Sequence, residues 1–233
     1  MTSNVHKANR VLASIPAKDY TRLQAALEPI ELTFGRVLYL PGKAIKYVYF
    51  PTNCLISLLT TVDKQRSLEV GMVGNEGMAG IPFILGIRVS NVRAIVRAEG
   101  NALRMASALF RIEFDRNAAL QDALFRYTYA LMAQISQTAA CNRFHHAEAR
   151  LARWLLMTRD RVGSDVLLVT HQFLAHMLGL RREGVTEAAA ALKQRKLINY
   201  SRGNLKILNV RGLQKASCIC YQPVKTVSNR AQD

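Results

Sequence analysis

The chain has 233 residues, half of them hydrophobic and 21% charged, a composition that supports one or two folded domains with a substantial core. Its 32 Lys and Arg residues against 16 Asp and Glu give a formal net charge of +16, which favours a polyanionic partner, with nucleic acid ahead of an anionic membrane surface. We find no secretory signal pattern, no apolar run long enough to span a membrane and no disulfide framework among four scattered cysteines. We therefore expect a cytoplasmic protein without a membrane partner.

The N-terminal half changes character after a short helical lead-in that ends near Glu28. Short β-rich runs such as "RVLYL", "KYVYF" and "CLISLLTTV" follow up to about Phe110, separated by turn signals that include Pro41-Gly42, Pro51 and Gly100. Short strands at regular intervals with turns between them are typical of a β-sandwich or barrel.

A long helix is predicted next, over Asp115–Asn142. Leu120, Leu124, Tyr127 and Leu131 alternate in spacing between four and three residues, the pattern of a coiled-coil seam. A helix that only covers the β-rich region is one interpretation. A second apolar stripe, containing Phe125 and Ile135, favours a helix with one face for that region and one face for a partner helix, and we assign the seam to the partner.

The C-terminal third predicts a helix over 146–162, a turn at Gly163 and then two short helices. Thr170 is a good N-cap for the first, Gly179 suits the sharp turn, and the second opens at Arg181. Two short strands around residues 201–204 read as a hairpin. Residues Arg181–Lys215 carry nine basic and two acidic side chains. A packed helical hairpin explains the helices alone, but a winged helix-turn-helix explains the helices, the hairpin and the charge together.

The order of these elements resembles the Crp/Fnr family of bacterial transcription regulators. The resemblance is strongest in "VTHQFLAHMLGLRREGVTEAAAALKQRKLINYSRGNLKIL", while "YFPTNCLISLL", "EVGMVGNEGMAG" and "VRAIVRAEG" look like the cyclic-nucleotide-binding-type β-roll of that family. It implies an α+β fold: a sensory β-roll (a double-stranded β-helix or jelly-roll) over 1–114, a dimerisation helix over 115–144 and a winged helix-turn-helix over 145–233. It also implies a homodimer on double-stranded DNA with an inverted-repeat operator, and RNA polymerase as a further partner.

The resemblance assigns DNA-binding roles by position. Arg182 and Glu183 match the base-reading Arg-Glu pair of the family, and Thr170 and Gln172 match residues that hold the DNA backbone. Glu187 stands where the best-known members have a basic base-contacting residue, which leaves the operator sequence open. An arginine can bind guanine O6 and N7 together, and a glutamate can accept from the cytosine amino group. Five other cations of this region are expected to contact phosphates: Arg181, Lys193, Arg195, Lys196 and Arg202.

The signal that the N-terminal domain senses is not evident. Family members that bind cyclic AMP need a Glu for the ribose and an Arg for the phosphate, but Pro82 and Val92 stand at those positions. We therefore predict that cyclic AMP is not the effector. Glu76 and Arg93 are the remaining candidate effector-pocket residues, although Arg93 would lie on the other face of its strand.

No cofactor or metal site is predicted. The chain has no cysteine before Cys54, whereas the iron–sulfur relatives have an N-terminal cysteine cluster. Cys141 and His145 would share a helix face, but two ligands do not make a metal site, and Cys218-x-Cys220 is a weak redox or metal signal. No catalytic motif is present, so we expect no enzyme. A sequence-independent DNA-binding protein and a nucleotide-binding regulatory subunit remain as alternatives.

Overall fold

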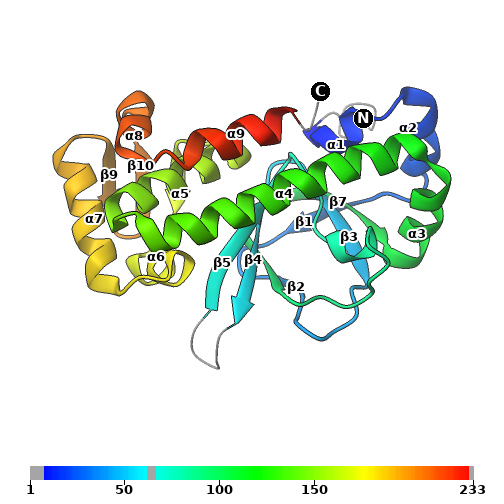
Figure 1. Cartoon of the computed structure of the whole chain (residues 1–233), viewed down its shortest axis with the longest axis horizontal. Helices are drawn as coiled ribbons and strands as arrows, with labels where there is room; N and C mark the ends of the chain where they lie inside the picture. The colour runs from blue at the N-terminus through cyan, green and yellow to red at the C-terminus, as the bar shows by residue number, and fades with distance from the viewer. Residues whose placement is uncertain (1–7, 62–66, 231–233) are drawn as a thin grey trace.

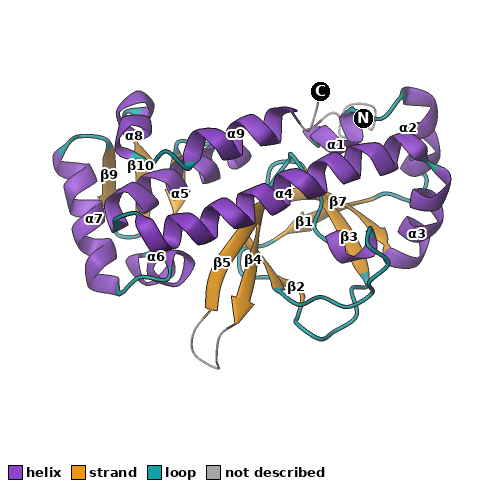
Figure 2. Ribbon diagram, viewed as in Figure 1, coloured by secondary structure: helices purple, strands orange, loops and turns teal. Residues whose placement is uncertain are grey.

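The computed structural model describes residues 8–61 and 67–230. Helices α1 (Arg10–Ala13) and α2 (Ala17–Gln24) lead into a β-rich region, and a long helix then crosses to a C-terminal region that is mostly helical (Figures 1 and 2). The expected α+β architecture is confirmed. None of the helices in the described ranges is apolar over enough of its length to cross a bilayer.

The β-rich region consists of two antiparallel sheets that share one core. The first has the strand order β1 (Glu28–Leu32), β7 (Gly100–Ala106), β3 (Tyr47–Pro51), and the second has the order β2 (Val37–Tyr39), β6 (Arg93–Ala98), β4 (Leu55–Thr61), β5 (Ser67–Val73). Phe50 and Met105 from the first sheet meet Ile56 and Val96 from the second in one apolar cluster. The alternating inward residues of both sheets therefore build a roll with a filled interior, not a closed barrel.

The predicted helix Asp115–Asn142 is divided at Asn117. Helix α3 (Ser107–Arg116) directly follows β7, and helix α4 (Ala118–Phe144) begins anew. Asn117 lies outside both helices in an extended conformation, and its Oδ1 accepts a hydrogen bond from the Leu120 backbone N–H at 2.9 Å. A side-chain cap of this kind starts a helix, which explains why α4 begins later than the apolar spacing suggested.

The predicted dimer seam is assigned to the wrong face of α4. Leu120, Leu124, Tyr127 and Leu131 are all buried within the chain, in the same apolar cluster as the interior of the β-roll. Figure 1 shows α4 lying across the roll. These residues therefore attach the helix to its own β-roll and are not available to a second copy.

The C-terminal region begins with α5 (Ala147–Val162), which the sequence predicted. It continues with β8 (Val166–Leu168), α6 (His171–Leu178), α7 (Arg182–Gln194) and the hairpin β9 (Ile198–Ser201) and β10 (Asn204–Ile207), with the strand order β8-β10-β9. Helices α8 (Val210–Ala216) and α9 (Tyr221–Arg230) were not predicted. Helix α9 runs back alongside α4 towards the N-terminal helices (Figure 1).

The outer face of the larger sheet packs against the C-terminal region. Leu55, Leu59, Met72 and Ile95 of the roll belong to the apolar cluster of α5, α6 and α7. Two polar contacts cross the same boundary: Arg161 Nε donates to Glu76 Oε1 at 2.7 Å, and Trp154 Nε1 donates to Glu69 Oε1 at 2.8 Å. Helices α6 and α7 are therefore carried on α5, which is itself fixed to the roll.

Candidate nucleic-acid interface

The helix-turn-helix forms where the sequence predicted it. Thr170 caps α6, because its Oγ1 accepts a hydrogen bond from the Phe173 backbone N–H at 3.1 Å. Gly179 ends α6 with a φ of +59°, a conformation that favours glycine, and Leu180 packs into the corner. Helix α7 then buries Val185, Ala188, Ala189 and Leu192 against the domain core, so its opposite face points to solvent.

The outward face of α7 carries the residues expected to read bases. Arg182, Glu183 and Glu187 are all exposed, and their side chains make no hydrogen bond or ion pair with other residues in the described part of the chain. Arg182 is the first residue of the helix. Free, outward-reaching side chains at the first turns of a helix are what direct readout of a major groove requires.

A stacked pair joins the two helices to the hairpin, and sequence analysis missed it. The His171 and Tyr200 rings lie nearly parallel with centroids 4.5 Å apart, and Thr186 Oγ1 lies 2.9 Å from His171 Nδ1. Burial, and after it the charge of Arg182, lowers the pKa of His171. The contacts of His171 with Tyr200 and Thr186 join the start of α6 to β9 and to α7.

The hairpin presents Arg202 at its tip. Arg202 and Gly203 both have positive φ, +49° and +82°, which is the geometry of a tight two-residue hairpin turn. Lys196, with a φ of +54°, follows the end of α7, and both cations are exposed. These two residues fit the predicted role of phosphate contacts.

Two other predicted phosphate contacts are already engaged within the domain. Arg195 forms an ion pair with Glu148 of α5 and remains half exposed, so its phosphate contact stays a prediction that competes with this pair. Lys193 Nζ donates to the Tyr200 carbonyl oxygen at 3.2 Å and thereby ties α7 to the hairpin. Arg181 is the N-cap residue of α7 and is exposed.

Thr170, Gln172 and Arg202 line one wall of an apolar groove of about 860 Å³ between α6 and the β-roll. Arg97 of β6 reaches into the same groove, with its guanidinium carbon 5.0 Å from the centroid of the Phe173 ring. These three of the residues expected to hold the DNA backbone therefore lie together, but they face the roll, whereas the first turn of α7 is open to solvent.

The structure does not bring together the two predicted effector-pocket residues. Glu76 is buried in the ion pair with Arg161. On β6, Ala94 and Val96 face the interior of the roll, so Arg93 points out of it, on the same face as Ile95. The prediction that Glu76 and Arg93 line an effector pocket is wrong, because the alternation of the strand separates Arg93 from the interior.

Comparisons with known proteins agree with this geometry. Residues 149–216 match the family model of the Crp-like helix-turn-helix domain. A search of the curated proteins finds no match.

Solved structures with a similar fold include FixK2 from Bradyrhizobium japonicum, with a TM-score of 0.70 and 12% identity over 82% of this chain and 98% of that one. A CRP-family transcriptional regulator from Thermus thermophilus aligns with a TM-score of 0.63 and 18% identity, over 81% and 96% of the two chains. The c-di-GMP-responsive global regulator CLP from Xanthomonas campestris gives 0.63 and 17%, over 82% and 99%. The Thermus thermophilus protein is described as a transcriptional regulator and the Xanthomonas campestris protein as a global regulator.

Proposed function

We propose that this chain, whose residues 149–216 match the Crp-like helix-turn-helix domain, is a transcription regulator of the Crp/Fnr type that binds specific sequences of double-stranded DNA as a homodimer. The observation that carries the proposal is the free first turn of α7. Arg182 and Glu183 project from a rigid helix, and Lys196 and Arg202 flank them as cations without an acidic partner in the described part of the chain. Arg182 reads a guanine and Glu183 a cytosine amino group, while the flanking cations hold phosphates.

The proposed dimer uses the outward face of α4. Phe125, Tyr129 and Met132 are 50%, 67% and 62% exposed and repeat the spacing of four and three residues on the side away from the roll. A chain that exposes three large apolar side chains in one helical stripe needs a partner to cover them. A second copy supplies an identical stripe, and a two-fold axis along α4 then brings two α7 helices to the same side of a duplex.

The operator follows from that symmetry. Two reading helices related by a two-fold axis enter successive major grooves roughly 34 Å apart, so the operator is an inverted repeat with half-sites about one helical turn apart. By resemblance to the family we also propose RNA polymerase as a partner. Cyclic AMP is not the effector in this proposal, because Val92 packs against the apolar interior of the roll at the position where a phosphate-binding arginine is required.

Footprinting of the purified protein on genomic fragments, followed by selection from randomised DNA, tests the proposal. The matched variants are Arg182→Ala and Lys196→Ala, which each remove one exposed cation from the same domain. Arg182→Ala should cost roughly 1–3 kcal/mol per half-site and relax preference at one symmetric base pair. Lys196→Ala should weaken operator and random DNA alike and reduce the salt dependence by about one phosphate per subunit.

Equal losses on operator and random DNA for Arg182→Ala would show that this residue only holds phosphate. If the wild-type protein itself bound operator and random fragments with similar affinity, the chain would be a sequence-independent DNA-binding protein. If it bound no DNA at moderate salt, the alternative of a nucleotide-binding regulatory subunit would replace the proposal.

A further inference from the structure

Four residues with metal-binding side chains meet where α4 ends. Cys141 and His145 lie one turn apart at the end of α4, and Cys218 and Cys220 lie in the link between α8 and α9. One ligand atom from each of the four lies within 4.8 Å of all the others. The sequence offers these residues only as two separate weak pairs, and the fold brings the pairs together.

The spacing of the four atoms fits a single tetrahedral ion. Cys141 Sγ lies 3.4 Å from Cys218 Sγ, and Cys220 Sγ lies 3.4 Å from His145 Nδ1. Around zinc, with Zn–S near 2.3 Å and Zn–N near 2.0 Å, neighbouring ligand atoms of a tetrahedron are about 3.5–3.8 Å apart. The two 3.4 Å contacts therefore lie within a few tenths of an ångström of this spacing, and the other pairs lie within 4.8 Å. An iron–sulfur cluster distributes its ligands over two or four iron atoms, so ligand atoms on different iron atoms lie further apart than around a single ion.

Two buried arginines beside the cluster lack a carboxylate partner. Arg150 and Arg153 of α5 are both buried, their charges interact with the Cys141 thiol, and neither forms an ion pair with an acidic residue within the described ranges. The Nε atom of each is buried with no hydrogen-bond partner in the same part of the chain. Three thiolates around a divalent ion carry a single net negative charge, which is the counter-charge that a buried guanidinium requires.

A further polar contact supports one of the sulfur atoms. Gln137, one turn before Cys141 on α4, donates from Nε2 to Cys220 Sγ at 3.0 Å. Hydrogen bonds of this type orient metal ligands and stabilise the thiolate form. The three cysteines are buried and form no disulfide.

We propose that Cys141, His145, Cys218 and Cys220 bind one zinc ion in a closed, structural site. Soft thiolates with one imidazole in a tetrahedral arrangement select zinc over the oxygen-preferring cations, and four protein ligands leave no open position for catalysis. The inference does not depend on the proposed DNA-binding activity.

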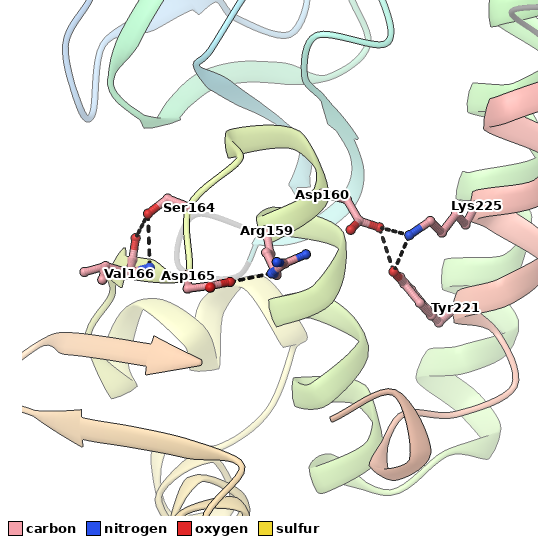
Figure 3. Close-up of polar contacts among 7 residues, drawn as sticks. All are labelled: Arg159, Asp160, Ser164, Asp165, Val166, Tyr221 and Lys225. Atoms are coloured by element: carbon pink, nitrogen blue, oxygen red, sulfur yellow. Dashed lines mark hydrogen bonds and ion pairs between the residues drawn. The ribbon is translucent and has the colours of Figure 1, made fainter. Parts of the chain in front are cut away.

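The site fastens the C-terminal segment to the junction between the two halves of the chain. His145 is the C-cap of α4, immediately before α5 and the DNA-binding domain. Beyond the site, Tyr221 donates its hydroxyl hydrogen to Asp160 Oδ2 at 2.7 Å, and Lys225 Nζ lies 3.2 Å from the same oxygen (Figure 3). The ion holds the segment just before α9 on α4, and these contacts hold the first two turns of α9 on α5. The metal therefore fixes the helix-turn-helix domain relative to α4.

Metal analysis of the untagged, full-length protein tests the site. Elemental analysis after gel filtration should find about one zinc per chain, and Cys218→Ser or His145→Ala should lose most of it. The matched controls are His146→Ala, which changes the neighbouring histidine, and Cys54→Ser, which changes a buried thiol in the β-roll; both should keep the ion. Cobalt(II) added to the metal-free wild-type protein should give the intense absorption of a tetrahedral thiolate site.

Several results would overturn the inference. The first is a wild-type protein that contains no zinc and gives no cobalt bands, and the second is zinc that both ligand variants retain. The third is a stoichiometric Cys141–Cys218 disulfide in protein purified under reducing conditions. The fourth is the presence of iron together with acid-labile sulfide. If a ligand variant does not fold, cobalt titration of the wild-type chain decides alone. Removal of the ion by a chelator should increase hydrogen exchange in α9, and unchanged exchange there would refute its fastening role.

Discussion

Glu69 allows the boundary between the β-roll and α5 to be tested by pH. Its carboxylate is buried, and it accepts hydrogen bonds from Ser57 of β4 and from the indole N–H of Trp154, 2.8 Å away on α5. Burial raises its pKa to about 7, against the two hydrogen bonds and the positive charges of Arg97 and Arg161, which all lower it. The group is therefore largely protonated in the folded protein at pH values where it is ionised in the unfolded chain.

The direction of the pH effect follows from that difference. A carboxyl group whose pKa is raised on folding contributes its full stability below its unfolded value of 4.5, and this contribution is lost as the pH rises through about 7. The shift corresponds to about 3 kcal/mol of unfolding free energy between pH 4.5 and pH 8. Glu69→Gln keeps a neutral side chain of the same shape, so it should remove this part of the pH dependence and should gain stability relative to wild type as the pH rises.

Trp154 reports the titration directly, because it is the only tryptophan of the chain. Its fluorescence in the folded wild-type protein should titrate with a midpoint near pH 7, and the transition should be missing in Glu69→Gln. Urea unfolding of both proteins from pH 5 to pH 8 supplies the free energies, and the histidines that titrate in this range cancel in the difference. A stability difference between the two proteins that is the same at pH 5 and pH 8 would refute the reasoning.

Two further perturbations test the helix α4 and its surroundings. Tyr129→Glu with Met132→Glu should give folded monomers in sedimentation without a loss of thermal stability per chain, and a dimer that persists would exclude this face of α4. Gly77→Ala should destabilise the chain by about 1–3 kcal/mol, because a Cβ there would lie 2.0 Å from the Tyr127 ring. Gly184→Ala should instead stabilise the chain by about 0.5–1 kcal/mol, because Gly184 lies within helix α7 and a Cβ there would have no atom within 4 Å. Thermal unfolding measures both effects. Equal effects of the two glycine substitutions would contradict the packing of α4 on the roll.

The helix-turn-helix was predictable because its signals are local. Thr170 as a cap, Gly179 at a positive φ and the apolar face of α7 all lie within a few residues of the structure that they specify. The turn at Arg202-Gly203 is equally local. Contacts between these elements, such as the stack of His171 on Tyr200, depend on how the helices and the hairpin are placed and carry no comparable sequence signal.

The dimer stripe shows the limit of periodicity. A spacing of four and three apolar residues indicates that one face of α4 is buried. It does not indicate the packing partner, because a helix that packs on its own β-roll and a helix that packs on a second copy show the same spacing. Leu124 and Leu131 pack on the roll, and the weaker stripe of Phe125, Tyr129 and Met132 is left exposed. The face of α4 with the larger number of aliphatic side chains is the more deeply buried one, and in this chain that face packs on the β-roll of the same chain.

Glu76, Arg93 and the cysteine cluster show why sites are harder to predict than elements. The partner of Glu76 is Arg161, 85 residues away, and the partner of Cys141 is Cys218, 77 residues away. Strand alternation alone argued against Arg93 as an effector-pocket residue, because neighbouring residues of a strand point to opposite faces of the sheet. No local rule, however, indicates that a Cys-x-Cys near the C-terminus returns to the end of α4. That return depends on α8 and α9, whose packing on α5 and α4 brings the two weak pairs of ligands together. The zinc proposal therefore depends on the tertiary fold, and the elemental analysis tests that fold together with the site.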